Sequence, residues 1–227
     1  MKFYDMHINS EDTEKTTEMA KKLGWGGLVF IRKWNGWNSS DKKNESISEQ
    51  IKKIKSLDAS FGVFIETTNA NEMQKVVRSI RKKVPIIIVK TYDLNFNRAV
   101  LETPEVDVLS GSDIKLNHVM AELARKNNIA IEFNFHDIII SYKKSREHIF
   151  INMIENAKFI KKYRSPFILT SGAMDQWDLR SPFDMLSFGR LLGFKDPEIK
   201  KSMSDFIVKE NRKRLSGKWI APGIELE

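Results

Sequence analysis

The sequence contains no cysteine. Disulfide bonds and thiolate metal sites are therefore excluded, and a reducing compartment is compatible with this composition. Glycine and proline are sparse, with 11 and 6 residues in a chain of 227, which excludes a low-complexity or collagen-like chain. No apolar run approaches the length of a membrane span, and no apolar segment of the signal-peptide type follows Met1-Lys2. We therefore expect a soluble, cytoplasmic protein that does not contact a membrane.

The charges are unbalanced. Lys and Arg together number 38 against 30 for Asp and Glu, which gives a net charge of +8 and an isoelectric point near 9.5. Basic surface gains free energy when it displaces counterions from a polyanion, so RNA or DNA is a natural partner class. Charge alone is equally compatible with a basic protein that binds no nucleic acid.

Short apolar runs alternate with longer helical patterns along the chain. The expected strands are Phe3–Ile8, Leu28–Ile31, Phe61–Ile65, Ile86–Val89, Val106–Leu109, Ile129–Phe133 and Phe167–Thr170. The expected helices lie near Thr13–Leu23, Ser46–Leu57, Asn71–Lys82, Phe96–Leu101, Asn117–Lys126, Ser145–Tyr163, Phe183–Leu192 and Pro197–Arg214.

This alternation predicts an α/β protein with a parallel sheet. About seven strand–helix units favour a closed or nearly closed, TIM-barrel-like arrangement with the helices outside. An eighth strand is not recognisable, and a doubly wound open sheet remains the alternative. Residues 1–227 are expected to form one domain, with a polar loop at Lys33–Asn44 and a loosely attached tail from about Ser216.

One loop at a predicted strand end carries a phosphate-binding signature. The run Phe167-Ile168-Leu169 ends in Thr170-Ser171-Gly172-Ala173, and a helix start follows with Ser181 as N-cap and Pro182 at the first helical position. Arg180 comes just before that helix, where a guanidinium and helix N–H groups can address one phosphate. The alternative is a solvated loop arginine.

Several segments together resemble a known family. They are Phe3-Tyr4-Asp5-Met6-His7, Asp107-Val108-Leu109-Ser110, Asn117-His118-Val119-Met120-Ala121-Glu122-Leu123-Ala124, Ala130-Ile131-Glu132-Phe133 and the loop around Arg180. In this order, from Phe3 to about Arg214, they resemble protein component 3 of ribonuclease P, the thirty-kilodalton-type subunit of archaea and eukaryotes. The resemblance implies a TIM-barrel-like fold related to that of the polymerase-and-histidinol-phosphatase proteins.

The resemblance also implies a function. Ribonuclease P removes the 5′ leader from precursor tRNA, and in this family's assemblies the RNA supplies the catalytic centre. The expected role is a non-catalytic protein subunit that binds and stabilises that RNA and meets precursor tRNA only indirectly. The expected protein partner is the small ferredoxin-like subunit of the same particle, with two copies of each.

We select eight candidate RNA-binding residues. Lys90 follows the fourth expected strand and Arg98 is expected to open the next helix, so both are placed on one rim. Arg32 and Lys33 precede two tryptophans, which suits base stacking but equally suits a lid or a protein contact. The complete set is Arg180, His118, Arg98, Lys90, Lys126, Lys162, Arg32 and Lys33. For Lys126 and Lys162 the alternative is simple neutralisation of a helix C-terminus.

A metal-dependent phosphoesterase is the alternative function. Asp5-x-His7-x-Asn9 resembles the His-x-His opening of the polymerase-and-histidinol-phosphatase metalloenzymes, and Asp178-Leu179-Arg180 lies where they place a closing Asp-x-His. Asn9 is a weak metal ligand, however, and the fixed charge of Arg180 repels a cation.

The whole chain has four histidines, of which His118 and His148 fall in expected helices. We therefore expect no metal, no cofactor and no catalytic residue in the isolated chain. A single ion bound by Asp5, His7 and Glu66 stays open, as does a hydrogen-bonded plug made by the same residues. Other classes left open are a barrel enzyme using Glu66, Glu132 and Lys90, and a module that binds only proteins.

Overall fold

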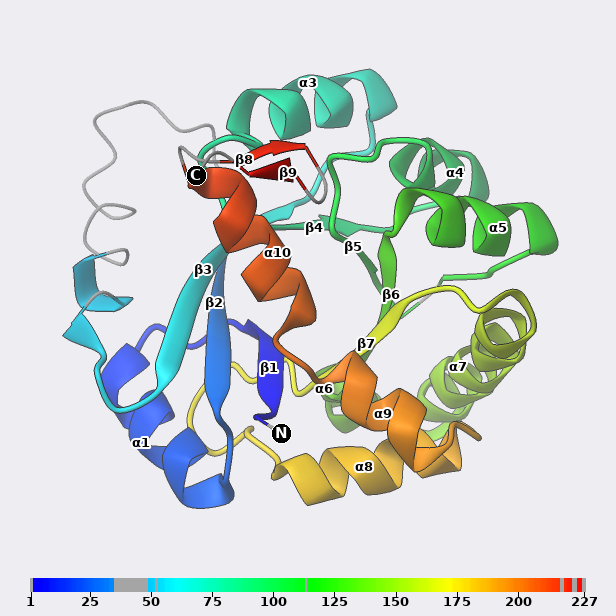
Figure 1. Cartoon of the computed structure of the whole chain (residues 1–227). Helices are drawn as coiled ribbons and strands as arrows, with labels where there is room; N and C mark the ends of the chain where they lie inside the picture. Colours follow the sequence, from blue (N-terminus) through cyan, green and yellow to red (C-terminus); the bar gives the residue numbers. More distant parts are fainter. Residues whose placement is uncertain are drawn as a thin grey trace.

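The computed structural model describes residues 2–34, 49–51, 53–112, 114–216, 219–221 and 224–225. A seven-stranded parallel sheet curls into a nearly closed barrel with helices around it (Figure 1). The strands are β1 (Tyr4–Ile8), β2 (Gly27–Lys33), β3 (Asp58–Ile65), β4 (Ile86–Lys90), β5 (Val108–Ser110), β6 (Ala130–Asn134) and β7 (Phe167–Thr170). Each expected strand is present, with ends shifted by up to a few residues.

The strands follow one another around the barrel in sequence order, from β1 to β7. A doubly wound sheet reverses its strand order at a switch point, so that alternative is wrong. The first and last strands meet without a regular ladder, and one backbone bond joins Asn9 N–H to the Ala173 carbonyl at 2.8 Å. We call this junction of β1 and β7 the seam. Among the described residues no eighth strand enters the barrel, and the tail instead contains an antiparallel pair, β8 (Trp219–Ala221) and β9 (Ile224–Glu225).

The helices differ from expectation at two places. They are α1 (Thr13–Leu23), α3 (Ala70–Ile80), α4 (Leu94–Leu101), α5 (His118–Asn127), α6 (Phe135–Ile140), α7 (Lys143–Tyr163), α8 (Pro182–Leu191), α9 (Asp196–Ser202) and α10 (Phe206–Leu215). The single helix expected near Pro197–Arg214 is two helices, because Met203 leaves the helical conformation and the Ser204 N–H closes a turn onto the Lys201 carbonyl at 3.1 Å. The short helix α6 was not expected.

Two other expectations involve residues that the structure does not describe. Most of the helix expected at Ser46–Leu57 lies outside the described residues, although 49–51 and 53 are helical. Most of the polar loop Lys33–Asn44 also lies outside them.

Apolar side chains pack on both faces of the strands. One cluster fills the inside of the barrel and includes Tyr4, Met6, Val29 and Ile88. Strand side chains that point outward, such as that of Ile87, pack against the helices. Burial on both faces explains why the strands read as continuous Ile- and Val-rich runs rather than as alternating patterns. The helices therefore form an outer layer around an already filled interior.

Helix α10 lies across the amino-terminal end of the barrel (Figure 1). Its Val208 is 1% exposed and joins the interior cluster. Arg81 makes a bidentate pair with Asp107 at the start of β5, at 2.6 and 2.8 Å, and Asn211 of α10 donates to the same carboxylate at 2.8 Å. The carboxyl ends of the strands, at the other end of the barrel, are consequently the end that α10 leaves uncovered.

Candidate functional site

Polar side chains occupy the barrel interior where the strands end. Nδ1 of His7 on β1 lies 2.8 Å from Oε1 of Glu132 on β6, and the Thr170 hydroxyl of β7 donates to the same oxygen. The side chains of His7 and Glu132 are 4% and 0% exposed. Burial lowers the pKa of His7, but the carboxylate of Glu132 outweighs this and raises it. Burial likewise raises the pKa of Glu132, but His7 outweighs this and lowers it, so the two form a buried ion pair.

Asp5 lies in the seam rather than with that pair. Both of its carboxylate oxygens accept the backbone N–H of Ser171 at 3.2 Å, and one also accepts the N–H of His7 at 3.3 Å. Burial raises the pKa of Asp5 to about 6, against hydrogen bonds that lower it. Asp5 therefore connects the first strand to the end of the last strand.

Glu66 follows β3 and binds two lysines. Lys33 of β2 and Lys90 of β4 both form ion pairs with its carboxylate. Hydrogen bonds from Lys33 and then Lys90 lower the pKa of Glu66 to about 2. The two lysines are 58% and 42% exposed at their side chains, so this group presents a net positive charge to solvent.

These contacts bear on the metal hypothesis. Within the described ranges, no group of three or more His, Cys, Asp or Glu side chains is placed to hold a metal ion. The acids that could act as ligands already have cationic or N–H partners: Glu132 pairs with His7, and Glu66 pairs with two lysines. Asp5, His7 and Glu66 thus belong to three different interactions.

The loop after β7 folds back over β6. Gly172 has φ +64°, and a Cβ added there would lie 2.1 Å from Oδ1 of Asn134, so only glycine fits this close approach. His136 N–H donates to the Ser171 carbonyl at 3.0 Å, and Nδ1 of His136 lies 3.6 Å from Oδ2 of Asp178. The loop that carries Arg180 is thereby positioned beside the start of α6.

Arg180 differs in one respect from the sequence expectation. The sequence predicts a loop arginine turned toward a phosphate or toward solvent, but Arg180 is half-buried, and its Nη1 donates to the carbonyls of Trp177, Asp178 and Leu179 at 2.9–3.1 Å. Its own carbonyl accepts the indole N–H of Trp25 at 2.8 Å. The expected N-cap is confirmed, because Ser181 and Asp184 form a capping box at the start of α8. Arg180 therefore shapes its own loop.

Arg32 is similarly occupied. Its guanidinium donates to the carbonyls of Ser10 at 2.7 Å and Ile31 at 2.8 Å, and desolvation lowers its pKa. Lys33, the next residue, is exposed. Of the two tryptophans in this region, Trp34 packs against the core and Trp37 lies outside the described residues.

The remaining candidates lie on two different ends of the barrel. His118 is the exposed first residue of α5, and Asn117 is the N-cap of this helix. Arg98 does not open α4, because that helix begins at Leu94. The Arg98 guanidinium instead pairs with the Glu102 carboxylate at 2.8 Å.

Lys126 and Lys162 are exposed in the last turns of α5 and α7. They therefore lie at the end opposite to Lys33 and Lys90, since barrel helices run antiparallel to their strands.

Two features were missed by sequence reasoning. The His7–Glu132 pair joins residues 125 positions apart, and no local spacing indicates such a contact. Large apolar side chains are also exposed on the segments after β6 and β7: Ile140, Tyr142, Met174, Trp177 and Phe183, at 53–72% exposure. Apolar residues beside loops are common in sequences, so the sequence does not indicate which of them are exposed in the folded protein.

Comparison with known proteins connects this architecture to one family. The family model described as RNase P subunit p30 matches residues 2–215. The chain belongs to this family. It is a protein subunit of ribonuclease P, as the sequence resemblance implied.

Two curated relatives illustrate the similarity. Ribonuclease P protein component 3 of Methanothermobacter thermautotrophicus is 31% identical over 212 residues, covering 90% of this chain and 86% of the relative. The protein of the same description from Methanococcus maripaludis strain S2 is 33% identical over 231 residues, covering 97% of this chain and 95% of the relative.

Solved structures support the barrel fold of this p30-family subunit. A chain in the cryo-EM structure of archaeal ribonuclease P with mature tRNA matches with a TM-score of 0.83 at 24% identity, over 97% of both chains. Histidinol phosphate phosphatase from Lactococcus lactis, solved with zinc, L-histidinol and phosphate, matches with a TM-score of 0.52 at 11% identity, over 85% of this chain and 93% of the enzyme. The expected relation to the phosphatase barrel is therefore confirmed at the level of fold.

Proposed function

We propose that this subunit binds and stabilises the ribonuclease P RNA for removal of the 5′ leader from precursor tRNA, and that the isolated chain is non-catalytic. The family match over residues 2–215 carries this proposal. The net charge of +8 supports it, because RNA binding gains free energy from counterion release. The subunit contacts precursor tRNA only indirectly, through the assembled particle.

The eight proposed RNA-binding residues differ in what supports them. Lys33, Lys90 and His118 are available at the carboxyl end of the barrel, and Lys126 and Lys162 at the opposite end. Arg98 is exposed beside its partner Glu102. In Arg180 the three carbonyl contacts all use Nη1, which leaves the other edge of the fork for a phosphate. Arg32 is the weakest candidate, because backbone carbonyls already engage its guanidinium.

The non-catalytic assignment follows from how the polar residues are used. The phosphatase-like positions contribute a buried ion pair, a seam contact and a lysine-neutralised carboxylate, instead of a set of metal ligands. The hypothesis of a metal-dependent phosphoesterase is thus supported by fold similarity alone, and one fold can carry many different functions.

A protein partner is part of the proposal. The small ferredoxin-like subunit is expected from the family resemblance, with two copies of each protein. The exposed apolar side chains after β6 and β7, Trp177 and Tyr142 among them at 71% exposure each, suit such an interface.

We also propose that residues 1–227 form one domain. We further propose that this domain acts in the cytoplasm, because a cysteine-free chain suits a reducing compartment. No helix in the described part of the chain is long and apolar enough to cross a bilayer.

Reconstitution tests the proposal directly. The cognate RNA and the small subunit are combined with and without this chain, and cleavage of precursor tRNA is followed together with RNA affinity. We expect both cleavage and affinity to fall when the chain is left out, and light scattering to show a stable complex with the small subunit. Equal cleavage without the chain, or two proteins that stay separate at micromolar concentration, would contradict the proposal.

A further inference from the structure

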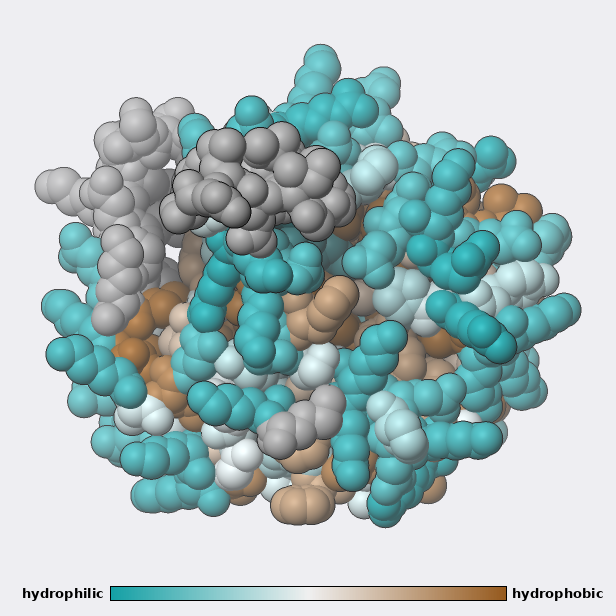
Figure 2. Space-filling model, viewed as in Figure 1, coloured by the Kyte–Doolittle hydropathy of each residue, from teal (hydrophilic) through white to brown (hydrophobic). Residues whose placement is uncertain are grey.

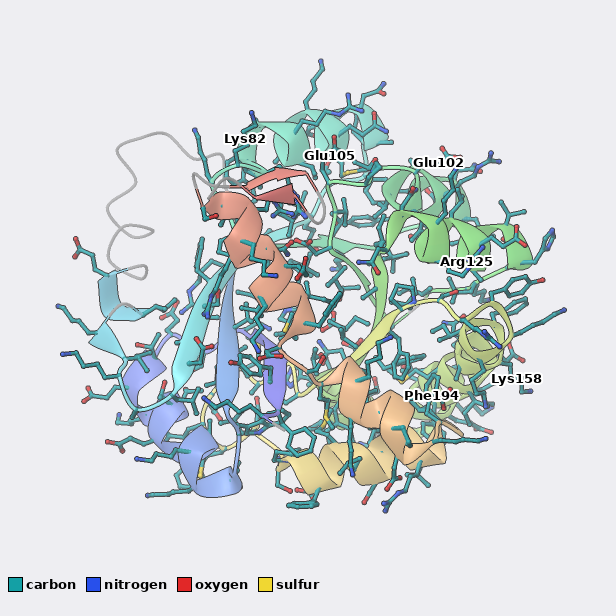
Figure 3. All side chains as sticks on the ribbon, viewed as in Figure 1. Lys82, Glu102, Glu105, Arg125, Lys158 and Phe194 are labelled. Carbon is teal, nitrogen blue, oxygen red and sulfur yellow. The ribbon has the colours of Figure 1, made fainter. Side chains whose placement is uncertain are left out.

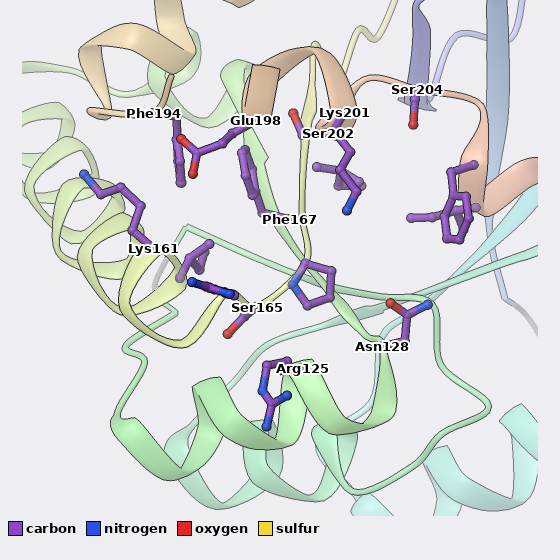
Figure 4. A pocket seen from close by; sticks show the side chains of 16 residues that line it. Arg125, Asn128, Lys161, Ser165, Phe167, Phe194, Glu198, Lys201, Ser202 and Ser204 are labelled. Carbon is purple, nitrogen blue, oxygen red and sulfur yellow. The ribbon is translucent and has the colours of Figure 1, made fainter. Parts of the chain in front are cut away.

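A pocket of 440 Å³ opens at the amino-terminal end of the barrel, away from the strand-end polar residues (Figure 4). It lies between the ends of α5 and α7, the start of β7, helix α9 and the start of α10. Its volume falls within the range of about 300–1,000 Å³ that small-ligand sites occupy. In Figure 3 the labelled Arg125 of α5 and Phe194 mark this side of the molecule.

The charge around this pocket has one predominant sign. Its lining includes four cations and one carboxylate, and the cations are Arg125, Lys161, Arg164 and Lys201. Figure 4 shows Arg125, Lys161 and Lys201 coming from three different helices around the opening. The one carboxylate, that of Glu198, accepts the backbone N–H of Lys195 at 2.8 Å as part of a helix cap. Neutralisation of a helix C-terminus explains each cation singly, but it does not require all four to surround one pocket.

The backbone conformation of Arg164 is a second observation. Arg164 ends α7 with φ +55°, in the left-handed region where glycine is the usual residue. Asn128, which ends α5 at φ 54°, also lines the pocket, but asparagine tolerates this conformation well. A residue with a β-carbon is less stable than glycine in this left-handed conformation after α7. The arginine at this position nevertheless places a guanidinium at the pocket.

The pocket also offers aromatic surface. Phe167 and Phe194 stack with ring centroids 4.0 Å apart and form part of the wall, with the Lys161 ammonium 5.8 Å from the centre of the Phe194 ring. Phe206, at the start of α10, lines the pocket and is 53% exposed. Figure 2, in the same view as Figure 1, shows apolar residues near the centre of this face with hydrophilic residues around them. A nucleotide could stack its base on a flat aromatic ring while the neighbouring cations bind its phosphate.

We propose that this pocket binds one unpaired nucleotide of an RNA strand, with the base against Phe206 and the neighbouring phosphates held by Arg125, Arg164 and Lys201. The proposal rests on the proposed function and deepens it by naming the class of RNA segment. An unpaired nucleotide is favoured over a duplex because a pocket of this size admits one base, and a base is available only where it is not stacked within a helix. An acidic peptide would satisfy the cations, but it would leave the exposed ring of Phe206 without a planar partner.

The test uses the full chain and two RNA probes. A nine-nucleotide oligo(U) with 2-aminopurine at its centre serves as the single strand, and a blunt RNA duplex of similar length serves as the comparison. We expect Arg164→Gly to weaken oligo(U) binding by about tenfold through loss of a charged contact, with a shallower salt dependence. Its melting temperature should be unchanged or higher, because glycine suits the left-handed position. Phe206→Ala should abolish the quenching of 2-aminopurine, and Phe206→Tyr should restore it.

Lys143→Gly is the matched control. Lys143 also combines a cationic side chain with a positive φ, of 47°, and lies at the opposite end of the same helix. Its replacement should leave oligo(U) affinity unchanged. Duplex affinity should change less than oligo(U) affinity in the Arg164→Gly and Phe206→Ala variants.

Each contrary outcome has one meaning. Wild-type oligo(U) affinity and quenching in both pocket variants would overturn the nucleotide pocket while leaving RNA binding by the subunit intact. If Arg164→Gly weakened binding of a fluorescent hexaglutamate peptide but not of oligo(U), the pocket would be an acidic-peptide site instead. If the unaltered chain bound neither RNA probe and did not affect precursor-tRNA cleavage in reconstitution, the proposed function itself would fail.

Discussion

His7 and Glu132 meet across the barrel interior, with Nδ1 of His7 2.8 Å from Oε1 of Glu132. The first residue comes from β1 and the second from β6, and neither is solvent-exposed. The carboxylate accepts the Thr170 hydroxyl as well, so the pair connects three strands. At the end of the barrel where barrel enzymes of this kind bind ligands, this subunit has an internal ionic contact between its strands.

Removal of one partner from this pair should be costly. Glu132→Ala leaves His7 buried without its counterion, and we expect the free energy of unfolding to fall by about 3–5 kcal/mol in urea titrations. Glu102→Ala is the control, because it removes an ion pair with Arg98 whose side chains are 61% and 45% exposed, and it should cost less than about 1 kcal/mol. Similar losses in the two variants would contradict the buried ion pair.

Asp5 should make stability depend on pH. Its pKa is about 6 in the folded protein and ordinarily 3.8, so the folded state binds this proton more tightly. The stabilising contribution is complete below the unfolded value and is lost as pH rises through the folded value. Asp5→Asn does not titrate. Urea titrations should show that wild type loses about 2–3 kcal/mol relative to this variant between about pH 4 and pH 7. A constant difference across this range would rule out the raised pKa.

Arg180 should act on both the loop and the RNA. Arg180→Ala removes the contacts of Nη1 with three carbonyls, and we expect the free energy of unfolding to fall by roughly 1.5 kcal/mol, near the lower value for charged hydrogen bonds. Affinity for the cognate RNA should fall about tenfold with a shallower salt dependence, and Arg180→Lys should recover only part of it.

A variant of the neighbouring tryptophan separates these two effects. Trp25→Phe removes the indole bond to the Arg180 carbonyl and keeps the guanidinium. It should lower stability without the loss of RNA affinity. If both variants bind RNA like the wild type, Arg180 is a structural residue only.

The contact between Asp107 and Arg81 should hold α10 in place. Arg81→Ala leaves the buried carboxylate of Asp107 with Asn211 and the Ile87 N–H as its partners, and we expect a loss of about 3 kcal/mol with faster amide exchange in α10. Arg78→Ala on the same helix removes an exposed arginine 3.8 Å from Glu105 and should change neither measurement appreciably. Unchanged exchange in α10 after Arg81→Ala would show that apolar packing alone fixes this helix.

The isolated chain should not hydrolyse phosphodiesters. We expect no turnover of bis(p-nitrophenyl) phosphate with added Mn²⁺ or Zn²⁺, because Glu132 and Glu66 are paired with cationic side chains. Activity that survives stringent purification and disappears in Asp5→Ala would restore the phosphoesterase hypothesis.

The strands and the helix α8 were predictable because their signals are local. Apolar runs such as Ile86–Val89 mark buried strands, and Ser181-Pro182 marks a helix start, so both appear in the structure. The break between α9 and α10 was missed because the helical periodicity continues across Ser204 and Asp205, and no glycine or proline marks the turn between them.

The site was less predictable because its contacts are long-range. The position of Lys90 after the fourth strand was expected, but the sequence does not show that Lys33 and Lys90 share the Glu66 carboxylate. The half-buried state of Arg180 depends on Trp25, which is 155 residues away. The four cations of the pocket come from α5, α7 and α9, and each of them alone is typical of an ordinary helix terminus.

The seam has a consequence for biosynthesis. Asp5 and Ser171 are 166 residues apart, so the first strand emerges from the ribosome long before the residue that it must meet. Until then β1 can pair only with β2, and its other edge stays available to unrelated strands. Barrel closure is therefore among the last folding events during synthesis, and α10 follows later still. This order exposes the nascent chain to aggregation until its carboxyl-terminal third has been made.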